Sequence, residues 1–351
     1  MSVIAAAALL GCVHAASPGD AVLVLGYGEG YPGDEPGAVE VYHTAVFVLS
    51  PDSVRRVADV SGIVLPLSTG FGRIGVSVVC EEDSRNRTTN YHQSVWRSDG
   101  GEPPDDKPAV PCRGATGSRP GSMVCDDYRA RILFAAPRLL STQMTTQQTS
   151  ECEPRGGHFW TSARVHMTAG KDSLSLTAIF DSSTIAAAYD RAMRQGFADL
   201  RREGFNCPEP SPDAYSYMSW GIEHQHGMWK PVAQVSEFGI WGECEFSQSM
   251  DLSLPDSLTG DASDGKLWSR LVTAIPDLTD YVASPGGEFV VAIAGKPGNS
   301  TIAVYRNAAP SPRKIWEGQW GARNNIVMVR WGAGAEAARW TAILTRLSPA
   351  K

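Results

Sequence analysis

One segment of strong helical periodicity constrains the fold more than any other feature of this 351-residue chain. The hydrophobic residues that recur there at helical spacing are Ile185, Tyr189, Met193, Phe197 and Leu200. They fall on one side of a helix, and Asp181, Ser182 and Ser183 offer side-chain oxygens for the exposed amides of its first turn. Gly204 follows at the position where helices often end in a left-handed residue. The pattern therefore predicts one long helix over about residues 183–203. Gly196 interrupts the apolar side, which indicates a close approach of this helix to a sheet.

Most of the remaining sequence is typical of strands and turns. Five strand-like runs near the C-terminus are separated by Gly- and Pro-rich turns, namely Glu288–Ala294, Thr301–Asn307, Lys314–Trp320, Asn325–Trp331 and Arg339–Leu347. A short helix is expected before them, over Leu267–Asp280. We predict an α+β fold, in which a mostly antiparallel β-sheet packs on the one long helix and ends in a C-terminal β-meander. The alternative is a β-propeller-like fold, because similar Ser-Pro turns precede strands at Ser50 and Ser284.

The N-terminus resembles an export signal. An Ala-rich apolar run precedes Val13-His14-Ala15, a small-residue cleavage pattern. We therefore predict a signal peptide over residues 1–15 and an extracytoplasmic location, in the periplasm or at the cell surface. The segment Leu9–Cys12 also resembles a bacterial lipoprotein box, in which Cys12 would be lipidated and anchor the protein. No later apolar run reaches the roughly 20 residues of a membrane span, so no transmembrane span is expected.

The chain contains seven cysteines, and six remain when Cys12 is set aside. An even number in an exported protein favours disulfides. We predict the pairs Cys112–Cys125, Cys207–Cys244 and Cys80–Cys152. Composition then suggests a β-rich region over 16–125 with a Pro/Gly/Asp-rich surface loop at 81–121, a central α+β domain over 126–258, and the meander over 259–351.

The central segment resembles the domain of unknown function shared by lysozyme-sensing anti-sigma factors and some peptidoglycan deacetylases. The resemblance covers about residues 128–258 and depends on short motifs: Leu140-Ser141, Gly156-Gly157-His158, Thr168–Lys171, Leu174–Phe180 and the strand Phe246–Pro255. Ala169 is an insertion relative to that family. The resemblance implies an extracytoplasmic α+β sensing or binding domain without catalytic residues of its own.

Two histidines and four aromatic residues are the candidate site residues. If residues 215–229 form one strand, His224 and His226 lie on the same face, at a spacing suited to a metal such as zinc. The pair lacks an identifiable third ligand, so packed histidines are the alternative and the sequence calls for no cofactor. The aromatic residues Tyr217, Trp220, Trp229 and Trp241 are clustered and could line a ligand groove, with core packing as the alternative.

The net charge of −7 and the absence of a basic run argue against nucleic acid as a partner. Three functions remain. The first is an exported cell-envelope binding or sensing protein without its own catalytic activity, whose partner is an envelope protein or glycan. The second is a metal-dependent hydrolase using His224 and His226, and the third is a β-propeller interaction scaffold.

Overall fold

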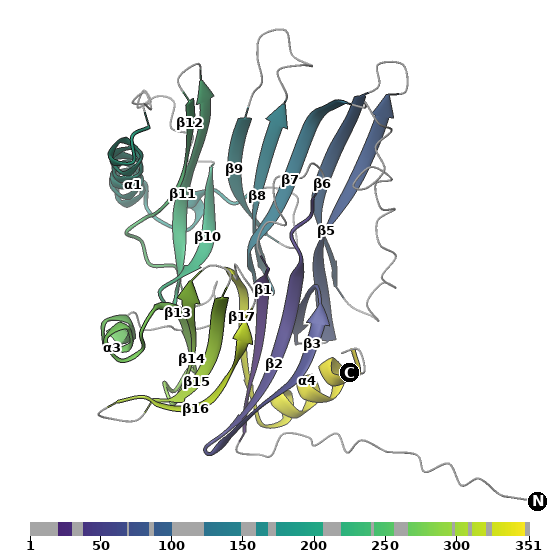
Figure 1. The fold of residues 1–351 in the computed structure, drawn as a ribbon, viewed down its shortest axis with the longest axis vertical. Helices are drawn as coiled ribbons and strands as arrows, with labels where there is room; N and C mark the ends of the chain where they lie inside the picture. Colours follow the sequence, from purple (N-terminus) through teal and green to yellow (C-terminus); the bar gives the residue numbers. More distant parts are fainter. Residues whose placement is uncertain are drawn as a thin grey trace, which may run out of the picture.

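The computed structural model describes residues 20–29, 38–68, 70–83, 88–99, 123–148, 159–167, 173–205, 219–239, 242–255, 266–296, 299–307, 311–320 and 325–347. These residues form four sheets and a few helices (Figure 1). The protein is thus mainly antiparallel β, which confirms the predominance of sheet. The predicted signal peptide at 1–15 and Cys12 lie outside the described residues.

The first sheet joins the two ends of the described chain. Its strands, in spatial order, are β17 (Asn325–Ala333), β1 (Ala21–Gly28), β2 (Tyr42–Ser50) and β3 (Ser53–Ser61). All neighbours are antiparallel. β1 is buried on both faces: Leu23 and Leu25 belong to one hydrophobic core, and Val22 and Val24 belong to another. Two-sided burial explains why β1 is a continuous apolar run instead of an alternating one.

The second sheet has six strands in chain order. They are β4 (Ile63–Leu67), β5 (Gly70–Asp83), β6 (Thr88–Asp99), β7 (Met123–Ala135), β8 (Leu139–Gln148) and β9 (Phe159–Met167). β6 and β7 are parallel, and the other neighbours are antiparallel. The surface loop predicted at 81–121 is therefore wrong at its start, since residues 81–83 and 88–99 are strand. The predicted boundary at 125/126 falls inside β7, so it does not separate sheets.

The third sheet carries the long helix. Its strands are β10 (Trp220–Gln225), β11 (Met228–Gly239) and β12 (Gly242–Ser249), and α1 (Ser182–Arg202) packs on β11 and β12 after the short 3-10 turn η1 (Leu176–Ala178). The predicted helix is confirmed, with its apolar side buried. Gly204 has φ +94°, as its position predicted. A Cβ on Gly196 would lie 2.3 Å from the Phe246 ring on β12, so this glycine is where helix and sheet approach closely.

The fourth sheet contains part of the predicted C-terminal meander. Its strands are β13 (Leu278–Ala283), β14 (Phe289–Lys296), β15 (Asn299–Arg306) and β16 (Arg313–Trp320), preceded by α3 (Lys266–Ala274). α3 confirms the first half of the helix expected at Leu267–Asp280, whereas residues 278–280 belong to β13. β17 leaves the meander and pairs with β1, so the predicted boundary at 258/259 does not separate the sheets either.

The last predicted strand, Arg339–Leu347, is wrong because this segment belongs to the helix α4 (Gly334–Leu347). Gly334 has φ +56° and ends β17. Beyond it, Ala337, Trp340, Thr341 and Leu344 recur at helical spacing and are buried. α4 packs against β1, β3 and β17. The prediction of a single long helix is thus also wrong, and α1 covers one sheet of four. Within the described part, no helix is long and apolar enough to cross a membrane.

Two of the six cysteines assigned to the mature chain have described side chains. Cys80 on β5 and Cys125 on β7 are disulfide-bonded. Cys112, Cys152 and Cys207, together with the side chain of Cys244, lie outside the described residues. The pairs Cys112–Cys125, Cys207–Cys244 and Cys80–Cys152 therefore stay predictions.

The cap of α1 gives a pH-dependent prediction. The Asp181 carboxylate accepts hydrogen bonds from the backbone N–H groups of Ser183 and Thr184, at 3.0 and 3.1 Å. Hydrogen bonds from the Ser183 and Thr184 side chains, followed by these backbone bonds, lower the pKa of Asp181 from 3.8 to about 2. Because the folded pKa is the lower one, the stabilisation by ionised Asp181 is complete above pH 3.8 and is lost as the pH falls through about 2.

We expect Asp181→Asn, which keeps an acceptor oxygen but no charge, to lower the thermal midpoint at pH 6. The difference from wild type should disappear towards pH 2, and circular dichroism melts across this range would measure it. A difference that does not change with pH would contradict this account of the cap.

Candidate functional site

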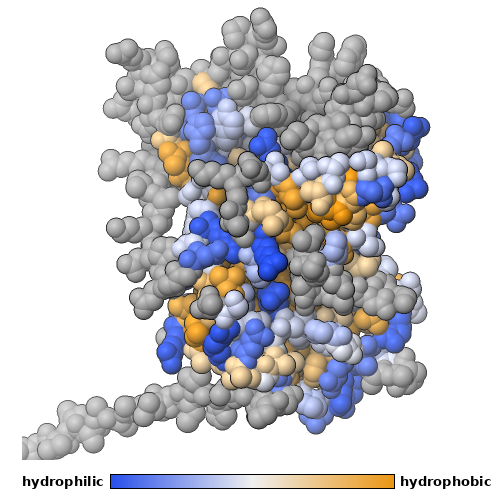
Figure 2. All heavy atoms as spheres, turned by 180° about the vertical axis from the view of Figure 1, so that it is seen from behind, coloured by the Kyte–Doolittle hydropathy of each residue, from blue (hydrophilic) through white to orange (hydrophobic). Residues whose placement is uncertain are grey.

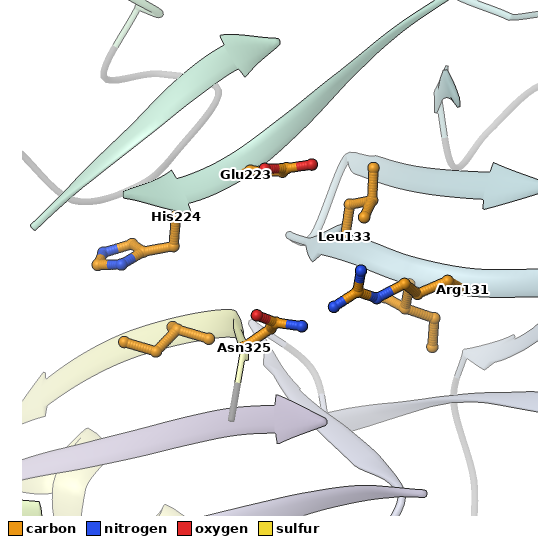
Figure 3. A pocket seen from close by; sticks show the side chains of 7 residues that line it. Arg131, Leu133, Glu223, His224 and Asn325 are labelled. Atoms are coloured by element: carbon orange, nitrogen blue, oxygen red, sulfur yellow. The ribbon is translucent and has the colours of Figure 1, made fainter. Parts of the chain in front are cut away.

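A small polar cavity lies where three of the four sheets meet. β10 contacts β7, β9 and β17 at this point. The cavity has a volume of about 70 Å³, and its lining residues are Arg131, Ile132, Leu133, Glu223, His224, Asn325 and Ile326. Figure 3 shows Arg131 and Leu133 on one side, Glu223 and His224 above, and Asn325 below. β7, β10 and β17 therefore each contribute a polar side chain to one space.

Arg131 is held in position by an ion pair with the buried residue Glu40. Arg131 Nε lies 3.2 Å from Glu40 Oε2, and the Glu40 side chain is only 1% exposed. The same carboxylate oxygen accepts the Tyr42 hydroxyl at 2.5 Å, and the Tyr42 oxygen accepts the Ile132 N–H at 2.7 Å. Burial, then the Glu40 charge, raise the pKa of Tyr42 well above its usual value of 10, so Tyr42 remains a neutral donor. This chain of contacts positions the guanidinium at the cavity wall.

Glu223 is oriented by polar side chains of its own sheet. Glu223 Oε1 accepts a hydrogen bond from the Ser247 hydroxyl at 3.0 Å, and Oε2 accepts one from Gln225 Nε2 at 3.1 Å. Gln225 in turn accepts a hydrogen bond from Ser249. Both donors are neutral groups. They fix the Glu223 carboxylate in place but do not neutralise its negative charge on the cavity wall.

His224 is fixed by an acid from the fourth sheet. Its Nδ1 lies 2.7 Å from Asp280 Oδ2 on β13, and its ring packs edge-on against Trp229 with a centroid separation of 4.7 Å. The His224 side chain is 3% exposed. In the neutral imidazole, donation from Nδ1 to this carboxylate makes Nε2 the acceptor nitrogen. The other Asp280 oxygen accepts the backbone N–H groups of Gly227 and Tyr281, both at 2.8 Å.

His226 does not share a face with His224, so the predicted single strand over residues 215–229 is wrong. The chain reverses at His226-Gly227, whose φ angles of +52° and +78° are those of a tight hairpin turn. His226 stacks on Trp268 of α3, with ring centroids 4.1 Å apart. The two imidazoles thus have different partners. Among the described residues, no group of three His, Cys, Asp or Glu side chains is placed to hold a metal ion.

The predicted aromatic groove is not formed by the two tryptophans whose side chains are described. Trp220 is fully buried and donates its indole N–H to the Leu174 carbonyl at 2.9 Å. Trp229 is 7% exposed and packs against Phe134 at 4.6 Å. Both belong to the hydrophobic core, which is the alternative that the sequence left open. Tyr217 and Trp241 lie outside the described residues.

Sequence reasoning missed Arg131, Asn325 and Asp280. Arg131 has a recognisable signal, because it is a charged residue directly before the apolar run Ile132–Ala135 of β7. Such a residue needs a partner when its strand is buried. Asn325 and Asp280 carry no comparable local signal. Asn325 reaches the site through the pairing of β17 with β1, and Asp280 reaches His224 through its contacts with the β10–β11 hairpin.

Comparison with known proteins identifies no family. No protein-family model matches the chain, and no curated protein matches it. A solved structure from Bacteroides fragilis, provisionally assigned as a 6-phosphogluconolactonase, aligns over 90% of this chain and 98% of its own, with 8% identity and a TM-score of 0.22. A likeness at this score carries no inference about fold or function.

Proposed function

We propose that the protein is an exported cell-envelope binding or sensing protein without catalytic activity of its own, and that the cavity is its ligand site. The observation that carries the proposal is that Arg131, Glu223 and His224, from β7 and β10, line one small cavity. Each of them is held by a further side chain, as preorganised binding sites require. The described lining includes one imidazole but no hydroxyl or thiol that would serve as a nucleophile.

The proposed partner is an envelope protein or glycan, contacted in the periplasm or at the cell surface. Export is supported by the signal-like N-terminus, with lipidation of Cys12 as the alternative to free release. Figure 2 shows hydrophobic surface interspersed with hydrophilic residues on the face opposite to that of Figure 1. The exposed large hydrophobic side chains of the described part are Val41, Val79, Met167, Phe205 and Val272.

Two measurements test this function. The full chain, expressed in a bacterial host, should appear in the extracytoplasmic fraction, and deletion of residues 1–15 should retain it in the cytoplasm. The mature chain should then bind purified peptidoglycan in a sedimentation assay, or one defined envelope protein in a pull-down. Glu223→Gln should weaken that binding, whereas Glu317→Gln on exposed β16 should not. Retention of the full chain in the cytoplasm, or equal binding by both variants, would contradict the proposal.

A β-propeller-like interaction scaffold is the second candidate. The pairing of β1 with β17 supports it, because one sheet then joins strands from both ends of the described chain. The four-stranded sheet β13–β16 has the form of a propeller blade. A scaffold would bind its partner through outer surfaces, so the same pull-down would show full binding by Glu223→Gln.

The different surroundings of His224 and His226 argue against the metal-dependent hydrolase. That function would require stoichiometric zinc in the purified protein, and the zinc would be lost when both histidines are changed to alanine. Elemental analysis of the two proteins would decide this alternative.

A further inference from the structure

We infer that the outer face of β5 and β6 is a second binding surface, and that it takes a neutral glycan chain with one sugar stacked on the ring of Trp96. The two strands are neighbours in the six-stranded sheet (Figure 1). The β5–β6 surface consists of three cross-strand pairs, Gly75 with Trp96, Ser77 with Ser94, and Val79 with His92. None of these residues lines the cavity, so the inference goes beyond the proposed ligand site.

The two faces of these strands differ in what they pack against. On the inner face, Val76 and Val95 pack on a hydrophobic core. Because side chains alternate along a strand, the β5–β6 surface points away from that core. Val79 is 56% exposed, and Ser94 is also exposed. Among the described residues, no hydrophobic core includes or supports Val79 or Trp96. Large apolar side chains gathered on the solvent side of a sheet indicate an interaction surface.

The indole of Trp96 lies flat on the sheet. A Cβ added to Gly75, the residue opposite, would lie 2.7, 3.0 and 3.2 Å from Cζ2, Cε2 and Nε1 of this ring. Three ring atoms at similar distances from one point mean that the ring covers Gly75 with one of its faces. The missing side chain of Gly75 makes room for the ring, and the other face of the indole is directed away from the sheet.

A second pair of rings follows along β6. His92 stacks on Tyr128 of β7, with ring centroids 4.7 Å apart and planes inclined by 16°. Four residues separate His92 from Trp96, which is about 13 Å along a strand. The hydroxyls of Ser77 and Ser94, 3.1 Å apart, lie between them. The surface therefore presents aromatic rings on both sides of a neutral hydroxyl pair.

This chemistry favours a neutral glycan. Sugar rings carry C–H groups on their faces, which pack on aromatic rings, and hydroxyls at their edges, which pair with groups such as Ser94. An anionic polymer would require Arg or Lys, and the β5–β6 surface contains neither. The net charge of −7 also disfavours such a polymer. An apolar peptide anchor requires a concave pocket, whereas these rings lie on the open face of a sheet.

Isothermal titration calorimetry with the full mature chain tests the inference. Chitohexaose and cellohexaose serve as neutral probes, and an oligogalacturonate of the same length serves as the anionic probe. We expect at least one neutral probe to bind, about tenfold or more tightly than the anionic one, because the surface offers stacking and hydroxyls but no cation. Absence of binding by both neutral probes, or equal binding of the anionic probe, would overturn the inference.

Matched variants locate the binding. Trp96→Ala should weaken it about tenfold or more, whereas Trp96→Phe keeps a ring and should retain most of it. Gly75→Ala keeps the indole, but its Cβ would tilt the ring away from the sheet, so this variant should also bind weakly. Phe205→Ala removes a ring that is 44% exposed on another segment, and it should change nothing.

The variants should keep the wild-type melting temperature, because Trp96 supports no described core. If Trp96→Ala folds poorly, the comparison of Trp96→Phe with Gly75→Ala decides the question. Wild-type binding by Gly75→Ala, or by a folded Trp96→Ala, would overturn the assignment to this surface.

Glu223→Gln separates this inference from the proposed function, because it should bind the neutral probe as the wild type does. If no neutral glycan binds while an envelope protein is retained and Glu223→Gln weakens its retention, the glycan surface is wrong and the proposed function stands. If the glycan binds with the expected variant pattern but Glu223→Gln changes no retention, the surface stands and the cavity is not the ligand site. Retention of an envelope protein that is lost in Trp96→Ala, without glycan binding, would identify a protein partner and overturn the glycan assignment.

Discussion

Replacement of Gly227 by alanine is expected to destabilise the protein more than any other single substitution predicted for it. Gly227 has φ +78°, and a Cβ at this position would lie 2.1 Å from the ring of Tyr281, which is fully buried. The left-handed conformation costs a non-glycine residue about 1–2 kcal/mol, and overpacking of a buried ring costs about 1–3 kcal/mol more. We therefore expect a loss of about 3 kcal/mol or more, measured by urea unfolding.

Gly204→Ala is the matched control for this prediction. Gly204 also has a positive φ, +94°, but a Cβ added there would meet no atom of the described residues within 4 Å. This variant should show only the conformational cost, of about 1–2 kcal/mol. Equal losses for the two variants would mean that the contact with Tyr281 does not matter, and that the hairpin does not pack against β13 as closely as described.

Removal of the Asp280 carboxylate is expected to have the second-largest effect. One oxygen of Asp280 binds His224, and the other accepts the N–H groups of Gly227 and Tyr281. The bonds to His224 and Gly227 connect the β10–β11 hairpin to β13, and so they join the third sheet to the fourth. Because Asp280→Ala leaves several nearly buried donors without an acceptor, we expect a loss of about 3 kcal/mol.

Asp280→Asn separates the contributions of the two oxygens. Its amide oxygen can still accept from Gly227 and Tyr281, while its NH₂ group replaces the oxygen that faces His224. We expect a smaller loss of stability than for Asp280→Ala. The control is Asp251→Ala, whose side chain is 92% exposed, and this variant should stay within about 0.5 kcal/mol of wild type. An Asp280→Ala variant that is as stable as the control would show that this connection does not hold the sheets together.

The elements that sequence reasoning placed correctly are those whose signals are local. The α1 helix follows from its periodic apolar residues, from the Asp181 cap and from the left-handed Gly204, all within one segment. Strands β14 to β16 follow from alternation between turn residues. The turn at His226-Gly227 also has a local signal, a glycine at the second position of a two-residue loop. Sequence reasoning missed it because the alternating residues on both sides also fit the apolar face of one continuous strand.

The errors arise where a segment's partner decides its structure. Residues 339–347 contain Trp, Thr and Ile, which favour strands, yet they form part of α4 because β3, β1 and β17 offer a face that buries Trp340 and Leu344. Strand preference depends strongly on such surroundings. In the same way, Trp220 and Trp229 have sequence features of a binding surface, and only packing against the helix and neighbouring sheets shows that they are core.

The amino-acid sequence by itself determined the strand-rich composition of this protein, its long capped helix and the turns of its meander, because these depend on interactions between residues a few positions apart. Only the tertiary structure decided that β17 pairs with β1, that Asp280 reaches His224, and that Arg131, Glu223 and Asn325 line one cavity. Strand edges present similar backbone donors and acceptors to any partner. The choice among partners therefore comes from the burial and side-chain packing of the whole molecule, which no local pattern records.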